Sequence, residues 1–251
     1  MTDHALTVLI VGATGSIGRH VVEQAVQAGH HTRALVRNSS KARSIVPGAE
    51  AVVGDLTDAS TLADAVAGID AVVFTHGSNQ AEAVNYGAVR NVLRALEGHP
   101  VRIALMTTIG VTTHYETSEW KRRGERLVRA SGNTYTIVRP GWFDYNAADQ
   151  LRITMRQGDT HLTGTPADGV VARRQIARVL LDSLTNPQAE HRTLELVAEH
   201  GPEQADLGPV FGALEPDPDG SLDGVKDPDN LPLSEEPQRV LDDLNTVREA
   251  A

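Results

Sequence analysis

The chain has 251 residues, a formal net charge of −10 and no cysteine. Its length allows one substantial hydrophobic core, and the lack of cysteine excludes disulfides, thiolate metal sites and cysteine nucleophiles. The longest apolar stretch, residues 5–13, is far shorter than the roughly 20 residues of a membrane span and follows no basic leader, so we expect a cytoplasmic protein without a membrane partner.

The charge is unevenly distributed along the chain. Residues 1–200 carry 20 acidic and 20 basic side chains, whereas residues 201–251 carry 13 acidic and 3 basic ones. A neutral body with an acidic end gives no electrostatic reason to expect DNA, RNA or anionic lipid as a partner.

The first 141 residues alternate short β-branched runs with helical patterns, which is typical of a parallel sheet with crossover helices. Strands are expected at 6–13, 30–37, 49–55, 70–76, 101–108 and 134–141. Apolar residues at helical spacing predict helices at 17–26, 62–68 and 88–96, and a more charged helix at 118–131. The pattern indicates an α/β fold with a doubly wound parallel sheet, whose ligand site lies at the carboxyl ends of the strands.

The pattern changes after residue 141. Residues 142–167 are polar and contain glycine, and we interpret them as substrate loops over the strand ends; a helix at 172–184 and a strand at 193–199 complete a single domain of residues 1–200. Residues 201–251 hold 7 of the 12 prolines and form an acidic arm with a short helix at 237–247. The arm is either disordered or docked through its apolar residues onto the body or onto a neighbouring subunit of a homo-oligomer.

The first expected strand leads into the sequence VGATGSIGRH, with glycine at 12, 15 and 18. A glycine turn between a strand and a helix lets the backbone approach a pyrophosphate, and the first turn of the helix presents free N–H groups and a partial positive charge. This context predicts a dinucleotide site on a Rossmann-type fold.

The second expected strand ends in LVRNSSKAR. Arg37 in this segment stands at the position that contacts the cofactor's ribose. An acidic residue there would favour NAD, because it accepts a hydrogen bond from the 2′-hydroxyl and repels a 2′-phosphate. Arginine instead grips a phosphate with paired donors. We therefore expect NADP(H) in preference to NAD(H).

Two further strand ends carry candidate cofactor contacts. Asp55 is placed to accept a hydrogen bond from the adenine amino group, with Leu56 packing beside the ring. After the fourth strand, Gly77 lets the backbone pass close to the cofactor. His76 precedes it, although a histidine at a strand end is more often structural than catalytic.

The segments at 12–18, 54–58, 107–111 and 120–143, together with Arg37, resemble the atypical short-chain dehydrogenase/reductase superfamily, in particular its NmrA-like, NAD(P)H-binding branch. The resemblance covers roughly residues 6–200 and leaves out the acidic arm. It implies a nicotinamide ribose contact from Lys121 and a set of further contacts to the cofactor. These are Gly12, Thr14, Gly15, Ser16, Ile17, Gly18, Arg37, Asp55 and Leu56, with Pro140, Gly141, Trp142 and Phe143 bordering the nicotinamide and substrate pocket.

The chain departs from this family at the proton donor. Family members with a complete catalytic set have Ser or Thr after the fifth strand, for which Thr107 or Thr108 qualifies, and Tyr four residues before the Lys. Four residues before Lys121 stands Thr117, whose hydroxyl is far too weak an acid. The remaining donors are Tyr115, His114, Tyr145 and water.

The helix at 118–131 has a second interpretation. Its arginines, at 122, 123, 126 and 129, are expected on the solvated side, and Lys121 with Glu125 is also consistent with an exposed i,i+4 pair. The histidines show no HxxxH or HExxH spacing, so we assign no metal.

The sequence thus predicts an NADP(H)-dependent oxidoreductase that transfers hydride between the nicotinamide and a small carbonyl-, imine- or quinone-type substrate. Two alternatives stay open. One is an NmrA-like dinucleotide-sensing regulator without turnover, suggested by the missing tyrosine and the acidic arm; the other is an epimerase or dehydratase with tightly held NAD.

Overall fold

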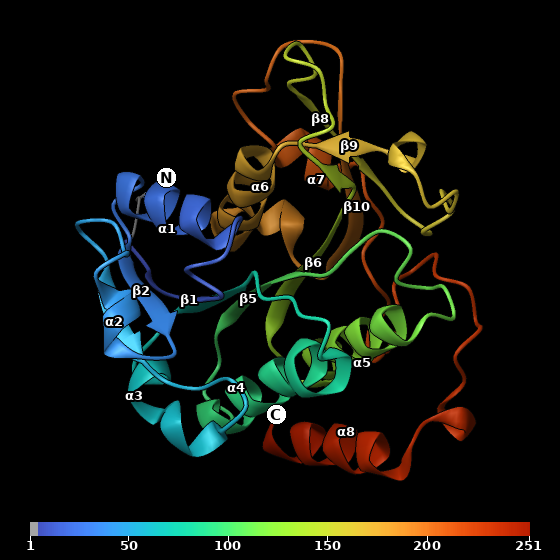
Figure 1. The fold of residues 1–251 in the computed structure, drawn as a ribbon. Coiled ribbons are helices and arrows are strands. Elements are labelled where there is room, and N and C mark those ends of the chain that lie inside the picture. The colour runs from blue at the N-terminus through green and yellow to red at the C-terminus, as the bar shows by residue number, and fades with distance from the viewer. Residues whose placement is uncertain (1–4) are drawn as a thin grey trace.

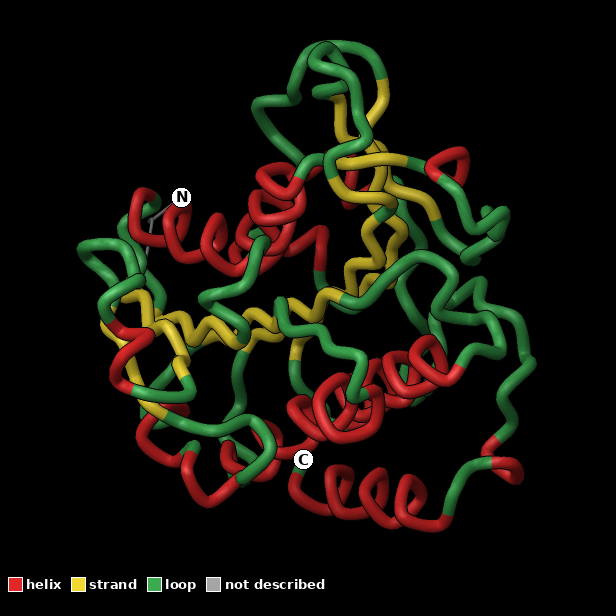
Figure 2. The backbone as a smooth tube through the Cα atoms, viewed as in Figure 1, coloured by secondary structure: helices red, strands yellow, loops and turns green. Residues whose placement is uncertain are grey.

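The computed structural model describes residues 5–251 and shows a twisted sheet with helices on both faces (Figures 1 and 2). The sheet has eight strands in the order β3-β2-β1-β4-β5-β6-β10-β8, all parallel to their neighbours except β8, which pairs antiparallel with β10. The strands are β1 (Thr7–Val11), β2 (His31–Val36), β3 (Glu50–Val53), β4 (Ala71–Phe74), β5 (Arg102–Met106), β6 (Thr134–Pro140), β8 (Arg152–Arg156) and β10 (Arg192–Glu199). The expected doubly wound sheet is confirmed, with its order reversing between β1 and β4, and the antiparallel β8 is its one departure from the expected parallel arrangement.

Helices cover both faces of the sheet because the central strands are apolar on both sides. In β1, Val8 and Ile10 belong to the core on one face, and Leu9 and Val11 to the core on the other, as the alternation of side chains along a strand requires. The first core is covered by α1 (Gly18–Gln27) and α6 (Arg173–Thr185). The second is covered by α3 (Ala63–Val66), α4 (Gly87–Leu96) and α5 (Glu116–Ala130).

The segment at 142–167 is more ordered than the expected loops. It contains β8 and also β7 (Trp142–Phe143), which pairs in parallel with β9 (Val170–Val171) in a small second sheet. The sequence of β8, RITMR, alternates polar and apolar residues, but two apolar residues within a polar, glycine-containing segment were too few to identify a strand. The order of β8 comes from pairing with β10, which sequence spacing alone does not reveal.

The acidic arm docks on the body of the protein. It leaves β10, packs α7 (Gly208–Gly212) against the first core through Phe211, runs down one side of the molecule and ends in α8 (Gln238–Ala250) on the opposite face (Figure 1). Helix α8 contributes Val240, Leu244 and Val247 to the second core. The arm therefore packs against both layers of helices and connects them.

The arginines of α5 bind the arm. The prediction that they are exposed to solvent is wrong. Arg122 donates to Asp223 at 2.8 Å, and Arg126 donates to Asp223 at 2.7 Å and to Glu236 at 2.8 Å. Arg123 also donates to Glu236, at 2.5 Å. All three arginines are buried. Their carboxylate partners lie 97 to 113 residues further along the chain, so local spacing could not indicate the pairing.

Arg129 and Glu125 extend this network to the sheet. Arg129 donates to Thr193 at 2.6 Å and pairs with Asp217 of the arm. Glu125 accepts two hydrogen bonds from Arg139 of β6 and is fully buried, so the interpretation of Lys121 and Glu125 as an exposed pair is also wrong. The excess acid of the arm thus neutralises buried cations of the body.

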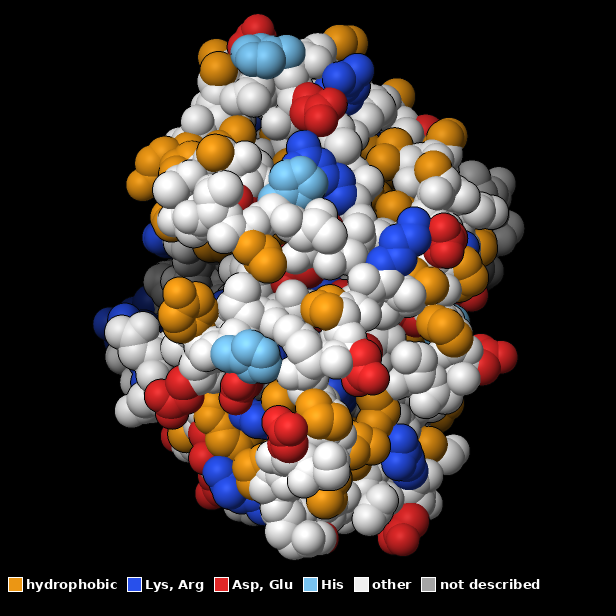
Figure 3. Space-filling model, turned by 90° about the vertical axis from the view of Figure 1, so that its right-hand side faces the viewer, with side chains coloured by type: hydrophobic (Ala, Val, Ile, Leu, Met, Phe, Trp, Pro, Cys, Tyr) orange, Lys and Arg blue, Asp and Glu red, His pale blue; other side chains and the backbone are white. Residues whose placement is uncertain are grey.

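None of the helices in the described part of the chain is long and apolar enough to cross a membrane. Figure 3 views the molecule from the side along which the arm runs, and acidic and basic side chains are interspersed over this face.

The Glu236→Gln substitution tests the network. Glu236 is buried and forms ion pairs with Arg123 and Arg126. Removing its charge therefore leaves two buried cations with too few acceptors. We expect the free energy of unfolding in urea to fall by about 3 kcal/mol. The control Glu235→Gln removes an exposed neighbour and should change it by less than about 0.5 kcal/mol. Equal effects of the two substitutions would show that the network adds no stability.

Candidate functional site

The glycine turn between β1 and α1 is closed by a hydrogen bond from the Gly15 N–H to the Gly12 carbonyl at 2.8 Å. Gly12 has φ +86°, and a Cβ on Gly18 would lie 2.1 Å from the Gly12 carbonyl oxygen, so both positions require glycine. No side chain caps the start of α1. The turn therefore exposes backbone and a helix amino terminus, the arrangement that receives a pyrophosphate. Thr14, Gly15 and Ser16 are exposed at its tip.

Arg37 and Asp55 lie at the ends of the adjacent strands β2 and β3. Arg37 is exposed directly after Val36. One oxygen of Asp55 accepts hydrogen bonds from the N–H and hydroxyl of Thr57, at 2.9 and 2.7 Å. These bonds, with a smaller contribution from the Arg37 charge, lower the pKa of Asp55. Asp55 is therefore an ionised acceptor beside an exposed cation, and Leu56 next to it is half-buried.

His76 follows β4, and its backbone lies against the glycine turn. Its Nε2 lies 3.3 Å from the Asn85 carbonyl oxygen, which can only accept, so Nε2 carries the proton. Its Nδ1 is buried and has no partner among the described residues. Burial lowers the pKa of His76 to about 4, so the ring is neutral at pH 7. Gly77 beside it has open space where a Cβ would stand.

Lys121 lies near His76, across a small cavity of about 10 Å³ that Thr107 also lines. Burial lowers the pKa of Lys121, and the Glu125 charge opposes this. The Thr107 hydroxyl donates to Glu125 at 2.6 Å. Thr107 is thus committed to the buried network, which leaves Thr108 as the hydroxyl that reaches the larger pocket.

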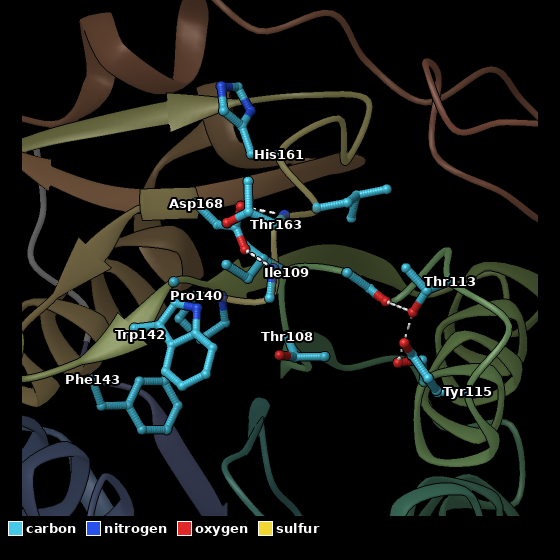
Figure 4. A pocket seen from close by; sticks show the side chains of 15 residues that line it. Thr108, Ile109, Thr113, Tyr115, Pro140, Trp142, Phe143, His161, Thr163 and Asp168 are labelled. Atoms are coloured by element: carbon cyan, nitrogen blue, oxygen red, sulfur yellow. Dashed lines mark hydrogen bonds between the residues drawn. The ribbon is translucent and has the colours of Figure 1, made fainter. Parts of the chain in front are cut away.

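The larger pocket has a volume of about 430 Å³ and lies beside the ends of β5 and β6 (Figure 4). Thr108, Ile109 and Gly110 form one wall, and Pro140, Gly141, Trp142 and Phe143 form a second. The third wall comes from the loop at 161–168. Aromatic rings from Trp142 and Phe143 stand side by side at one end, and Tyr115 lies at the other (Figure 4).

The candidate proton donors differ in how they relate to this pocket. Tyr115 lines it and is 72% exposed. His114 lies outside its lining and pairs with Glu119 at 3.5 Å. Tyr145 is exposed and stacks edge-on against Trp142 with ring centroids 6.0 Å apart. Of the three, only Tyr115 is brought to the pocket wall.

A family model described as NAD(P)H-binding matches residues 12–187, which is more than two thirds of the chain. The chain belongs to the NAD(P)H-binding family. The match spans the glycine turn, Lys121 and both strand ends that wall the pocket, and it agrees with the resemblance to atypical short-chain dehydrogenases/reductases.

Reductases are among the named proteins that are similar to this chain. It is 29% identical to the NAD(P)H azoreductase of Xenophilus azovorans, in an alignment covering 82% of this chain and 72% of the relative. A provisionally named NAD-dependent epimerase/dehydratase from Bacillus halodurans has a similar fold, with a TM-score of 0.71, 22% identity and coverage of 84% of this chain and 100% of that one. An NADPH-dependent quinone oxidoreductase from Escherichia coli, complexed with NADPH, has a TM-score of 0.58 and 20% identity, with coverage of 74% of this chain and 67% of that one.

Two aspartates of the loop at 157–168 were not predicted as part of the site. Asp168 accepts hydrogen bonds from the backbone N–H groups of Thr163 and Gly164, at 2.7 and 2.8 Å, and so shapes the third wall. Asp159 accepts from the N–H groups of Gly110 and Thr112, at 2.6 and 2.9 Å, and ties this loop to the first wall. A lone aspartate in a polar loop gives no signal, since its partners are backbone groups.

Glu195 of β10 was also missed. It is buried behind the third wall, next to a narrow void lined by Ile109, His161 and Asp168, which also line the pocket. One of its oxygens has no partner among the described residues. Burial raises the pKa of Glu195 to about 7, although the Arg139 charge opposes this.

The described residues contain no group of three or more metal-ligating side chains.

The raised pKa of Glu195 predicts a pH-dependent stability. Between its ordinary value of 4.5 and about 7, folded Glu195 holds a proton that the unfolded chain has released, so stability falls as pH rises through this window. Glu195→Gln stays neutral, so its stability relative to the wild type should rise by up to about 3 kcal/mol between pH 4.5 and 8, measured by urea unfolding. The control Glu199→Gln should show no such gain, because the pKa of Glu199 is lowered. A constant difference for Glu195→Gln would mean that Glu195 is charged when folded.

Proposed function

We propose that this NAD(P)H-binding protein is an NADP(H)-dependent oxidoreductase that transfers hydride between the nicotinamide and a small carbonyl-, imine- or quinone-type substrate. The observation that carries the proposal is the position of the 430 Å³ pocket. It lies at the carboxyl ends of the strands, bounded by Pro140–Phe143. A substrate there would meet a cofactor that lies across the switch point between β1 and β4.

The residues fit a dinucleotide along this edge. The exposed turn at 12–18 suits the pyrophosphate, Arg37 the 2′-phosphate, and Asp55 with Leu56 the adenine. Lys121, which lines the small cavity together with His76 and Thr107, suits the nicotinamide ribose, and Gly77 follows His76 in the chain. The bound cofactor supplies or accepts the hydride, and the protein holds the acceptor against it.

The proton is the demanding part of the reaction. Tyr115 is the side chain we propose as donor, because its ring lines the pocket from the residue that precedes α5. Its exposure also admits water. A substrate that needs little acid catalysis, such as a quinone or an imine, suits this site better than a simple ketone.

The pocket wall favours a flat, largely apolar substrate. Trp142 is 37% exposed, and Phe143 lies next to it, covered on one side by Arg173 at 5.3 Å from its ring centre. Planar rings stack well on such faces. The azoreductase and quinone oxidoreductase names among the similar proteins are in keeping with this chemistry.

Oxidation of NADPH, followed at 340 nm with a panel of quinones, imines, aldehydes and ketones, tests the activity directly. We expect turnover, fastest with the quinones. Tight NADPH binding without turnover of any of them would overturn the proposal and favour the sensing role. NAD that copurifies and survives dialysis would favour an epimerase or dehydratase.

Arg37→Ala tests the cofactor preference. Losing a charge-assisted hydrogen bond to the 2′-phosphate should weaken NADPH binding by about 10-fold or more, while NADH binding changes by less than about threefold. Calorimetric titration of both cofactors measures this, with Arg248→Ala on α8 as an exposed arginine control. Equal losses for NADPH and NADH would contradict the assignment.

A further inference from the structure

A second hollow adjoins the substrate pocket on the side of Tyr115. It is an open groove of about 810 Å³, and it shares Thr113, Tyr115 and Leu162 with the pocket. The pocket and the groove therefore border each other at the side chains of these three residues. In Figure 4, Thr113 and Tyr115 lie on the side of the pocket opposite Trp142 and Phe143.

The acidic arm builds the far wall of this groove. Lys226, Pro228 and Asn230 of the arm line it, facing Gly158 and Thr160 of the loop that also walls the pocket. These arm residues lie outside the part of the chain that matches the family model.

Asn230 fixes the arm against the floor of the groove. It accepts a hydrogen bond from Arg122 of α5 and donates one to the Thr112 carbonyl at 3.0 Å. The Thr112 N–H and hydroxyl in turn donate to Asp159, both at 2.9 Å. Hydrogen bonds thus fix the loop leading to Tyr115 to the arm on one side and to the loop at 157–168 on the other. The groove therefore has walls that are fixed by specific contacts.

One lining side chain of the groove, Lys226, is a cation that can receive an anion. The ionisable residues that line the groove are Lys226, His114, Tyr115 and Asp159. Asp159 is 2% exposed, and its oxygens are occupied by the N–H and hydroxyl donors of the loop at 110–112. Lys226 is half-exposed and pairs with the exposed Glu215 at 3.0 Å. Such an exposed pair is weak, so the ammonium group can turn towards a ligand.

We propose that this groove is a second substrate subsite, which receives a carboxylate- or sulfonate-bearing tail of an elongated planar substrate whose reducible head lies in the 430 Å³ pocket. Lys226 contacts the anionic group, and the hydroxyl groups of Thr113 and Thr160 border the tail. The inference rests on the proposed reductase function and adds the substrate class. It gives the acidic arm a role in specificity.

Three quinones test the subsite with the full-length protein and NADPH. They are 1,4-naphthoquinone, its 2-anilino derivative and its 2-(4-carboxyanilino) derivative, which share one head and add first a neutral and then an anionic tail. We expect kcat/KM for the carboxylated quinone to exceed that for the neutral-tailed one by about fivefold at low ionic strength, and the ratio to fall as salt is added.

Three groove variants and one control locate the effect. Lys226→Gln should bring this ratio close to one, and Lys226→Glu should invert it, whereas the control Arg248→Gln, on the same arm but outside the groove, should keep it. Thr160→Trp fills the groove and should lower kcat/KM for both tailed quinones relative to 1,4-naphthoquinone. Reduction of all three quinones with ratios that none of the groove variants changes would overturn the subsite alone. Failure to reduce any of them, with NADPH bound, would overturn the proposed function and the subsite with it.

Discussion

The buried carboxylate of Glu125 is the constraint on which much of this structure depends. It accepts hydrogen bonds from Arg139 at 2.6 Å and from Thr107 at 2.6 Å, and Arg129 lies 3.4 Å away. A carboxylate with no solvent is stable only when such donors surround it. One residue on α5 therefore ties together the ends of β5 and β6, the two strands whose ends wall the pocket.

Helix α5 contacts three parts of the molecule because its faces carry different kinds of side chain. Leu127 and Val128 pack into the core below the sheet, the arginines turn towards the arm, and Lys121 lines the small cavity next to His76. Arg139 links these roles, since it binds Glu125 on one side and Asp227 of the arm on the other, each at 2.6 Å. The position of Lys121 is thus set by contacts that extend into the last 50 residues of the chain. This explains why an arm outside the family match is joined so firmly to the site.

The sequence predicted the features that depend on local pattern. The runs of Val, Ile and Leu in β1 and β4 identified buried parallel strands, and the glycines at 12 and 18 stand where the backbone permits no other residue. Prediction from the sequence failed where a charged residue has a partner that is far away along the chain. Arg126 on a helix has the appearance of a surface residue until Glu236, 110 positions away, packs against it. Asp168 and Glu195 were not predicted for a related reason: their surroundings depend on how the loop closes and how the strands pair.

The account's central claim is that α5 positions the cofactor through Lys121 while it anchors the arm through its arginines. A crystal structure of the full-length protein with NADP+ tests it most directly. The account predicts the 2′-phosphate at Arg37, the nicotinamide ribose within hydrogen-bond distance of the Lys121 ammonium group, and the arm docked with Arg122 and Arg126 buried against Asp223. A nicotinamide ribose remote from Lys121, or a docked cofactor with the arm displaced from α5, would contradict it.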